Sequence, residues 1–334
     1  MNYGLVFMLF DELKQKLLGE KDPFIDILGQ EKVKMQLKSA LLAQRHVILV
    51  GPPGVGKTTL AKNIAKILGP IEIHEGFGKE KKTKKVEGVQ RFIRVQGSPD
   101  LTVEDLLGDI DPIKALQFGP LSLEAFTPGK IFKADNGILF LDEINRCPEK
   151  LQNALLQVLE EGKATIGSYD VDFPVNLIFI ATMNPEDTST EKLSDVLLDR
   201  FDMIPVSYPE TQEIEERIVV EKGEKFDIRF PEKTLHEMIA FVRLLRTHDK
   251  VEKKPGVRAS LGLYERAQTN AVLKKKTMVD LSDIQEALLS VLAHRIRLKP
   301  SVKYIQTPED FLSKEFKEFS QHYTDTSPVK GDGR

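Results

Sequence analysis

The segment "GPPGVGKTT", residues 51–59, has the residue types and spacing that bind a chain of phosphates. It contains the pattern G-x-x-x-x-G-K-[ST], in which glycines leave backbone N–H groups open to phosphate oxygens. Lys57 is expected to reach the β- and γ-phosphates and the Thr58 hydroxyl to hold Mg²⁺. No N-K-x-D motif for reading guanine occurs, which favours ATP. The expected nucleotide-binding residues here are Gly51, Pro52, Pro53, Gly54, Val55, Gly56, Lys57, Thr58 and Thr59.

A second group of chemically useful residues is the pair of acids in "GILFLDEINR", residues 137–146. The apolar run predicts a buried strand, and open α/β sheets bind their ligands at the carboxyl ends of strands. Asp142 is expected to bind both the nucleotide and its Mg²⁺, and Glu143 to polarise the attacking water. Adjacent acids also occur in solvated turns, but a phosphate-binding loop in the same chain favours the catalytic interpretation.

Two further polar residues lie at the ends of predicted strands and helices. Asn184 follows the apolar run 175–183 and could position the attacking water, although asparagine is also a common turn former. Arg200 follows the short helix predicted in "EKLSDVLLD". An arginine there is normally a surface charge, yet it could stabilise transition-state charge on a neighbour's γ-phosphate.

The elements that must position these residues can be predicted from the hydrophobic pattern. "HVILV" before the phosphate loop reads as a buried strand and "KTTLAKNIAKILG" after it as a helix. In "ATIGSYDVDFPV", residues 164–175, alternating side chains predict a hairpin with Tyr169 near its tip. From about residue 208 the strand signals stop and amphipathic helices follow, so an all-α domain is expected after the α/β one.

Composition places the chain in a broad class. Its 334 residues, 41% of them hydrophobic, and a net charge of −3 are typical of a globular protein of two domains. The one cysteine, Cys147, excludes an internal disulfide framework and favours a reducing, cytoplasmic location. The apolar start "MNYGLVFMLF" is too short to span a bilayer, and we expect it to pack or to be extended.

The order of these motifs resembles that of the AAA+ ATPases over residues 24–300. The resemblance is carried by "LVGPPGVGKTTLAKNIA", "GILFLDEINR", "ATMNP", "LLDRFD" and "GVRASLGLYERA". "VEDLLGDIDPIKAL", "AFTPGKIFKADNGILFLDEIN" and "AHRIRL" resemble more narrowly the ATPase subunit of magnesium chelatase and the related MoxR-type ATPases. The resemblance implies an α/β fold, a P-loop NTPase parallel-sheet AAA+ domain followed by an all-α lid domain.

The same resemblance implies domain boundaries. It gives an N-terminal segment 1–23, an AAA+ domain 24–207, a helical lid 208–300 and a C-terminal tail 301–334 that contains one amphipathic piece. Within the AAA+ domain it implies two insertions. These are a helix-2 insert at about 108–130 and a hairpin before the sensor 1 strand at about 163–174.

The resemblance also implies roles for single residues. Lys57 and Thr58 match Walker A, Asp142 and Glu143 match Walker B, and Asn184 matches sensor 1. Arg200 matches the arginine finger that acts on the neighbouring subunit, and Arg258 in "GVRAS" matches the sensor 2 arginine of the lid, in cis or in trans. A finger supplied by a neighbour implies a homo-oligomer, and the family's form is a hexameric ring with ATP between subunits.

One segment departs from the family pattern. Six basic residues against two acids give the run 79–91 a local charge of +4, from Lys79, Lys81, Lys82, Lys84, Lys85 and Arg91 against Glu80 and Glu87. Such a run predicts a solvated loop, with contact to an anionic protein or nucleic acid as the alternative.

Three functions compete for this sequence. The first is an ATP-driven motor that remodels or activates a partner protein, and the second is the motor subunit of a magnesium- or cobalt-inserting chelatase. The third, a nucleic-acid motor, is disfavoured because no aromatic and basic residues interleave as a stacking platform requires. A nucleotide-gated switch without turnover is disfavoured by Glu143. We expect the protein that the motor acts on to come from another chain, and a metal-ion-dependent adhesion domain is the module that such partners often carry.

Overall fold

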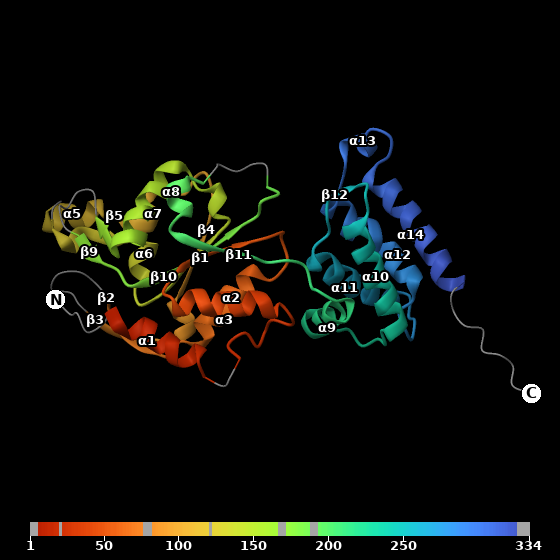
Figure 1. Cartoon of the computed structure of the whole chain (residues 1–334), viewed down its shortest axis with the longest axis horizontal. Helices are drawn as coiled ribbons and strands as arrows, with labels where there is room; N and C mark the ends of the chain where they lie inside the picture. The colour runs from red at the N-terminus through yellow and green to blue at the C-terminus, as the bar shows by residue number, and fades with distance from the viewer. Residues whose placement is uncertain are drawn as a thin grey trace, which may run out of the picture. The chain divides into compact units, whose positions relative to one another are not determined.

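The computed structural model of the chain describes residues 6–19, 22–75, 82–119, 122–165, 172–187 and 193–325. The chain forms two compact units (Figure 1). The first comprises Met1–Pro52 and Gly56–Val206, and the second comprises Pro53–Val55 and Ser207–Arg334. Each unit has its own hydrophobic core. No helix in the described ranges is both long enough and apolar enough to cross a membrane.

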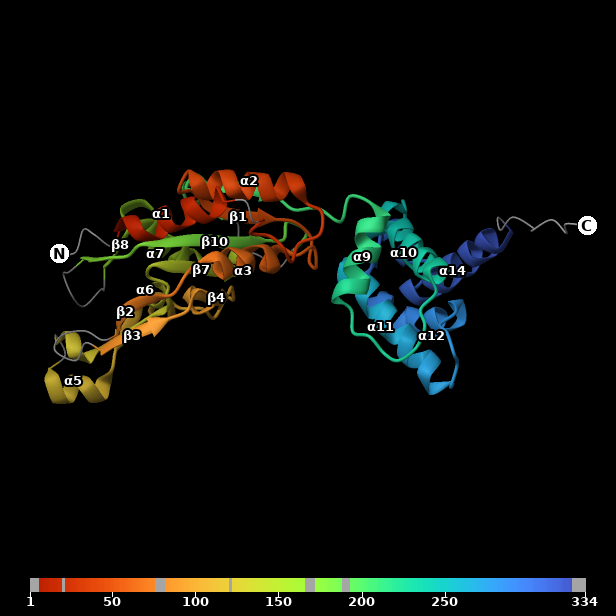
Figure 2. The same ribbon diagram turned by 90° about the horizontal axis from the view of Figure 1, so that it is seen from below.

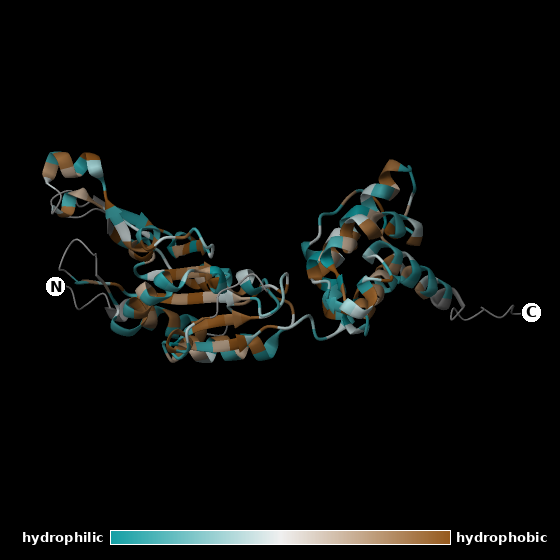
Figure 3. Ribbon diagram, turned by 90° about the horizontal axis from the view of Figure 1, so that it is seen from above, coloured by the Kyte–Doolittle hydropathy of each residue, from teal (hydrophilic) through white to brown (hydrophobic). Residues whose placement is uncertain are grey.

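The first unit is built on a five-stranded parallel sheet in the order β11-β1-β10-β7-β4. Its three central strands are nearly continuous apolar runs, and Figure 3 shows them largely in brown. Such runs are typical of parallel strands covered on both faces. The bounds are β1 (His46–Val50), β4 (Phe92–Gln96), β7 (Gly137–Asp142), β10 (Leu177–Met183) and β11 (Phe201–Pro205).

Helices cover this sheet. Leu139, Leu141 and Phe179 of β7 and β10 share one buried cluster with side chains of three helices, α6 (Lys130–Lys133), α7 (Glu149–Glu161) and α8 (Asp195–Leu198). The helix α2 (Glu31–Leu42) packs on β1 and β11, and α3 (Lys57–Ile67) packs on β7 and β10. The N-terminal segment, expected to pack or to be extended, forms α1 (Val6–Leu17), which packs against α2 (Figure 2).

The basic run corrects one expectation from the sequence. Instead of a solvated loop, its described part forms β3 (Lys82–Val86), paired antiparallel with β2 (Ile71–Glu75), and the 3-10 helix η1 (Gly88–Arg91). Arg91 is buried, and its guanidinium is satisfied there by donating to Glu12 Oε2 at 2.8 Å and to the carbonyls of Gly69 and Asn136. It therefore holds the fold together and is not part of an exposed basic surface. Lys79, Glu80 and Lys81 lie outside the described residues.

The two expected insertions are short antiparallel pairs. The first follows α4 (Val103–Leu107) and contains β5 (Gly108–Ile110), α5 (Pro112–Phe118), the 3-10 helix η2 (Leu123–Ala125) and β6 (Phe126–Pro128), with β5 paired to β6. Asp111 caps α5 by accepting from the N–H groups of Ile113 and Lys114. The second pairs β8 (Lys163–Thr165) with β9 (Asp172–Pro174). Tyr169, at the expected tip, lies outside the described residues.

The second unit is mainly helical. Its elements are α9 (Gln212–Lys222), α10 (Glu232–Thr247), α11 (Val257–Leu273), α12 (Leu281–Leu292), α13 (Pro300–Lys303), α14 (Pro308–Asp325), the 3-10 helix η4 (Ala293–Arg295) and a small strand pair of β12 (Val251–Lys253) and β13 (Arg297–Leu298). The helix α14, which the sequence places in a C-terminal tail, buries Phe311, Leu312 and Phe316 in the core of this unit. The ring of Phe316 meets that of Phe241 edge-on at 5.0 Å between centroids, so α14 packs as part of the unit.

Candidate active site

The register of the sheet brings the predicted phosphate loop and acids to one edge. Val50 at the end of β1 pairs with Met183 of β10, and Asp142 at the end of β7 pairs with Gln96 of β4. Because these strands are parallel, the loop after β1, the acids after β7 and Asn184 after β10 all emerge at the carboxyl edge. This is the edge where open α/β sheets bind their ligands.

The phosphate loop has a backbone that its glycines make possible. Gly54 and Gly56 have φ values of 80° and 95°, which favour glycine, and Gly56 caps the start of α3. A Cβ on Gly51 would lie 2.0 Å from the carbonyl oxygen of Val206. Lys57 Nζ donates to the carbonyl oxygens of Gly51 at 2.6 Å and Pro52 at 2.8 Å. The lysine therefore lies folded along the loop that is expected to receive the phosphates.

Thr182 of β10 fixes both acids. Its hydroxyl donates to Asp142 Oδ1 at 2.6 Å and accepts from the backbone N–H of Glu143 at 2.9 Å. Thr182 is fully buried, so its side chain has little freedom to move. A hydroxyl on the neighbouring strand thus sets where β7 ends and where its acids begin.

Each acid also has a basic or amide partner from β4. Arg94 donates to Asp142 Oδ2 at 2.7 Å, and Gln96 Nε2 donates to Glu143 Oε2 at 3.0 Å. Glu143 has a left-handed backbone, with φ at 57° and ψ at 55°, which is uncommon for a residue other than glycine and costs energy. This conformation ends β7 and starts the 3-10 helix η3 (Ile144–Arg146).

Arg146 and Asn184 are held by contacts within the unit. Arg146 donates to Asp187 at 2.9 and 2.6 Å and lies 3.2 Å from Glu143 Oε2. The hydrogen bonds to Asp187 raise the pKa of Arg146, so its charge is kept. Asn184 accepts through Oδ1 from the N–H of Glu186 at 3.2 Å, which closes a turn. The turn-forming role that the sequence left open is therefore present, and water positioning by Asn184 stays a prediction.

The structure places Arg258, but not Arg200, beside the phosphate loop, because a Cβ on Gly54, which belongs to the same unit as Arg258, would lie 3.2 Å from Arg258 Cγ. Arg200 directly precedes β11, and Phe201 pairs with His46 at the opposite end of β1 from the phosphate loop. The guanidinium of Arg200 pairs with Glu160 at 3.0 Å and with Asp199 at 2.8 Å. Arg258 belongs to the second unit, where it is the second residue of α11 and is exposed.

The donor set fits Mg²⁺. Thr58 and Asp142 offer a hydroxyl and a carboxylate oxygen, and Mg²⁺ is commonly held by one or two such protein ligands with phosphate and water oxygens completing its shell. Among the described residues no group of three or more His, Cys, Asp or Glu gathers as a metal site. Thr58 and Asp142 therefore fit a metal whose other ligands are phosphate and water oxygens.

Sequence reasoning missed Thr182, Arg94 and Gln96. A signal existed for the last two, because "RFIRVQG" places two polar side chains two residues apart at the end of an apolar strand. Thr182 could have been suspected from its place at the end of "LIFIAT", where a buried hydroxyl needs a polar partner. Which partner it meets depends on strand order, which one sequence does not reveal.

Comparisons with known proteins identify the family of the chain. The family model "Magnesium chelatase, subunit ChlI" matches residues 23–195, and the model "AAA lid domain" matches residues 245–315. A Methanocaldococcus jannaschii protein named magnesium-chelatase subunit ChlI homolog is 29% identical, with 83% of this chain and 86% of that protein covered. Chaperone MoxR1 of Mycobacterium tuberculosis is 27% identical, with 81% and 73% covered.

Two further comparisons concern an uncharacterised relative and a solved structure with a similar fold. The Bacillus subtilis protein YeaC, which is uncharacterised, is 28% identical, with 89% of this chain and 92% of that protein covered. The solved structure of a Thermotoga maritima RuvB mutant shares the fold at a TM-score of 0.51 and 19% identity, with 81% of this chain and 73% of that chain covered. The predicted fold class, a parallel α/β domain followed by a helical lid, is confirmed. The chain belongs to the magnesium chelatase ChlI family and is an AAA+ ATPase of the ChlI and MoxR type.

Proposed function

We propose that this chain is a motor that hydrolyses Mg²⁺–ATP to remodel or activate a partner protein. The observation that carries the proposal is the arrangement around Thr182, which holds Asp142 and Glu143 side by side at the same sheet edge as the phosphate loop. A magnesium ion bound there would neutralise charge on the β- and γ-phosphates. Lys57 would bind the phosphates, Thr58 and Asp142 would hold the ion, and Glu143 would take up a proton from the attacking water.

The place of Arg200 supports a shared site. Within its own chain it lies at the amino end of the strands, and the phosphate loop lies at their carboxyl end. Five residues of strand separate the two ends, which is roughly 16 Å. An arginine that far from its own nucleotide can act on γ-phosphate only in a neighbour, so we infer a homo-oligomeric ring, with six subunits as the family form. Arg258 is assigned to the nucleotide as sensor 2.

A second candidate is the motor subunit of a magnesium or cobalt chelatase. It is favoured by the name of the matching family and by the M. jannaschii relative. The two candidates differ in the partner. We expect an ATP-locked form of the chain to retain that partner during purification, and a recovered complex that inserts magnesium or cobalt when it hydrolyses ATP would favour the chelatase.

The hydrolysis step is tested by Glu143→Gln. This variant should bind ATP with near-wild-type affinity yet lose at least about a hundredfold in kcat, because the phosphate and metal ligands remain while the water loses its base. Lys57→Ala should instead weaken binding, since it removes the charge that meets the phosphates. Titration with a fluorescent ATP analogue separates the two effects.

The matched control is Glu161→Gln, which removes the same charge from an exposed position at the end of α7. It should leave both binding and turnover unchanged. Normal turnover in Glu143→Gln would remove Glu143 from the mechanism, and equal loss in Glu161→Gln would show that the effect is not specific to the site.

A further inference from the structure

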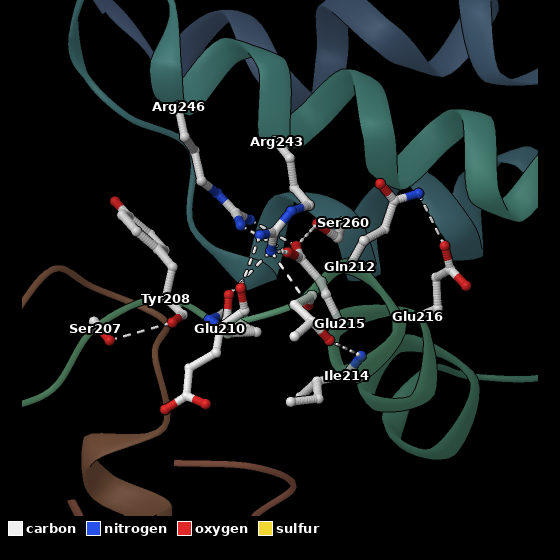
Figure 4. Close-up of polar contacts among 12 residues, drawn as sticks. Ser207, Tyr208, Glu210, Gln212, Ile214, Glu215, Glu216, Arg243, Arg246 and Ser260 are labelled. Carbon is white, nitrogen blue, oxygen red and sulfur yellow. Dashed lines mark hydrogen bonds and ion pairs between the residues drawn. The ribbon is translucent and has the colours of Figure 1, made fainter. Parts of the chain in front are cut away.

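A buried ion pair lies at the start of the second unit (Figure 4). Glu215 of α9 is fully buried, and Arg246 of α10 is nearly so. Arg246 donates to both carboxylate oxygens of Glu215, at 2.7 and 2.6 Å, and Ser260 of α11 donates to Oε1 at 2.6 Å. Three helices therefore meet at one carboxylate.

The pair reaches both sides of Arg258. Arg246 Nε donates to the carbonyl oxygen of Pro255 at 2.8 Å, three residues before Arg258. Ser260, two residues after Arg258, is the donor to Glu215. Arg258 itself is exposed. The cluster therefore holds the backbone on either side of Arg258 and leaves its side chain open to solvent.

The start of α11 has no side-chain cap. Its N-cap is Gly256, which has no side chain to accept from the first N–H groups, although its carbonyl oxygen accepts from the N–H of Ala259 at 2.9 Å. An uncapped helix start tends to fray because its first N–H groups lack partners. The contacts to Pro255 and Ser260 supply the missing constraint from outside the helix.

The same cluster holds the segment that enters the second unit. Arg243 of α10 donates to the carbonyl oxygens of Pro209 at 3.0 Å, Glu210 at 3.2 Å and Thr211 at 3.3 Å. It also lies 3.4 Å from Glu215 Oε2. The guanidinium of Arg246 stacks over the ring of Tyr208, 4.6 Å from its centroid. The entry segment 208–211 and the first turn of α11 are thus tied to the same carboxylate.

Stability alone accounts poorly for this arrangement. A buried ion pair loses most of its Coulomb energy to desolvation, and well-packed apolar residues often do as well or better. What the pair does supply is geometry, because a guanidinium fork and a carboxylate fit in one planar arrangement.

We propose that Glu215, Arg246 and Ser260 are positioning residues for Arg258. They hold the first turn of α11 in a fixed place relative to segment 208–211, so that Arg258 is presented to the nucleotide from a rigid base. The inference rests on the proposed function, since it takes Arg258 to act at the nucleotide.

The test uses Ser260→Ala, the mildest change in the cluster. It removes one donor to Glu215 and leaves the Arg246 pair in place, so the protein should fold. We expect kcat for ATP to fall about tenfold with KM changed far less, because misplacing a group that acts in the transition state costs turnover more than binding. In an Arg258→Ala background the same substitution should cause no further loss.

The control is Asn270→Ala on the same helix. Asn270 is buried and its Nδ2 donates to the carbonyl oxygen of Asp283 at 3.0 Å, so its removal also deletes a buried hydrogen bond from α11. It lies three turns further along the helix and should leave kcat within about twofold of wild type.

The outcomes separate the inference from the proposed function. A wild-type kcat in Ser260→Ala, or a loss that persists in the Arg258→Ala background, overturns the positioning role while the ATPase assignment stands. An Arg258→Ala protein that turns over at the wild-type rate overturns this inference together with the role of Arg258. Failure of the proposed function would show instead as unimpaired hydrolysis by Glu143→Gln.

Discussion

Asp142 has two oxygens, and in this structure both are in use. Thr182 donates to Oδ1 at 2.6 Å and Arg94 to Oδ2 at 2.7 Å. The Thr182 contact is compatible with a metal on the carboxylate, because a hydroxyl carries no charge. Arg94 is different, since a guanidinium and Mg²⁺ on the same carboxylate repel each other. We infer that Arg94 competes with Mg²⁺ for Asp142.

Replacing Arg94 by Met should therefore favour the metal. The Mg²⁺ concentration that gives half-maximal binding of a fluorescent ATP analogue should fall about two- to fivefold, which matches the loss of a partly exposed ion pair. Arg94→Lys keeps the positive charge and is the matched control, expected to lie near wild type. If wild type instead reaches half-maximal binding at a lower Mg²⁺ concentration than Arg94→Met, Arg94 helps to hold the site.

At the scale of residues, the sequence pointed to candidate site residues but not to the side chains that contact them. Asp142 and Glu143 were predicted because a strand pattern ended in acids. Arg91 was misread as part of an exposed basic run, since nothing local shows that Glu12, 79 positions away, accepts from it. Ion pairs across such distances depend on which elements become neighbours.

At the scale of elements, the two insertions are joined by aromatic rings. Phe126 of β6 stacks on Phe173 of β9 with 6.5 Å between centroids, and Phe132 of α6 meets both rings edge-on at 5.7 and 5.9 Å. The helix α6 leads directly toward β7, which carries Asp142 and Glu143. These contacts form a packed path between the insert, the hairpin and the strand that ends in the acids.

Phe173→Ala should uncouple the insert from the hairpin. We expect stability to fall by about 1–3 kcal/mol, as for loss of a partly buried aromatic ring, with basal ATPase kept. In a Glu143→Gln background, ATP should change hydrogen exchange in both β5–β6 and β8–β9. With Phe173→Ala added, ATP should change hydrogen exchange in only one of these two strand pairs.

Phe230→Ala is the matched control, because Phe230 stacks on Tyr264 at 4.8 Å in the second unit. It should destabilise the protein without altering the response of β5–β6. A response to ATP that survives in both pairs of Phe173→Ala would argue that the rings only fill space.

The elements themselves were predicted unevenly. Buried parallel strands such as β7 and β10 are continuous apolar runs that few other structures produce. The strand β3 was missed because its alternation, Lys-Thr-Lys-Lys-Val, is hidden by charge, and it pairs in a two-stranded hairpin with β2. The amphipathic pattern of α14 was recognised, but its docking on Phe241 is a tertiary contact that no local pattern predicts.

At the scale of the whole molecule, the proposed ring requires that one site be built from two chains. In a mixture of two inactive variants, activity can return only where a subunit with an intact phosphate loop and Glu143 meets a neighbour with an intact Arg200. Arg200→Ala and Glu143→Gln proteins should each be inactive alone. Mixed in equal amounts, roughly a quarter of interfaces would pair the intact halves, so up to about a quarter of wild-type ATPase should return.

Lys57→Ala mixed with Glu143→Gln provides the control, because both residues belong to the same chain's half of the site. No arrangement of those two variants restores an intact half, so no activity should return although mixed assemblies form to the same extent. If the Arg200→Ala mixture stays as inactive as this control while labelled subunits demonstrably exchange, Arg200 acts within its own chain or only through its pairs with Glu160 and Asp199. Recovery in the first mixture alone would place Arg200 at the nucleotide of the neighbouring subunit.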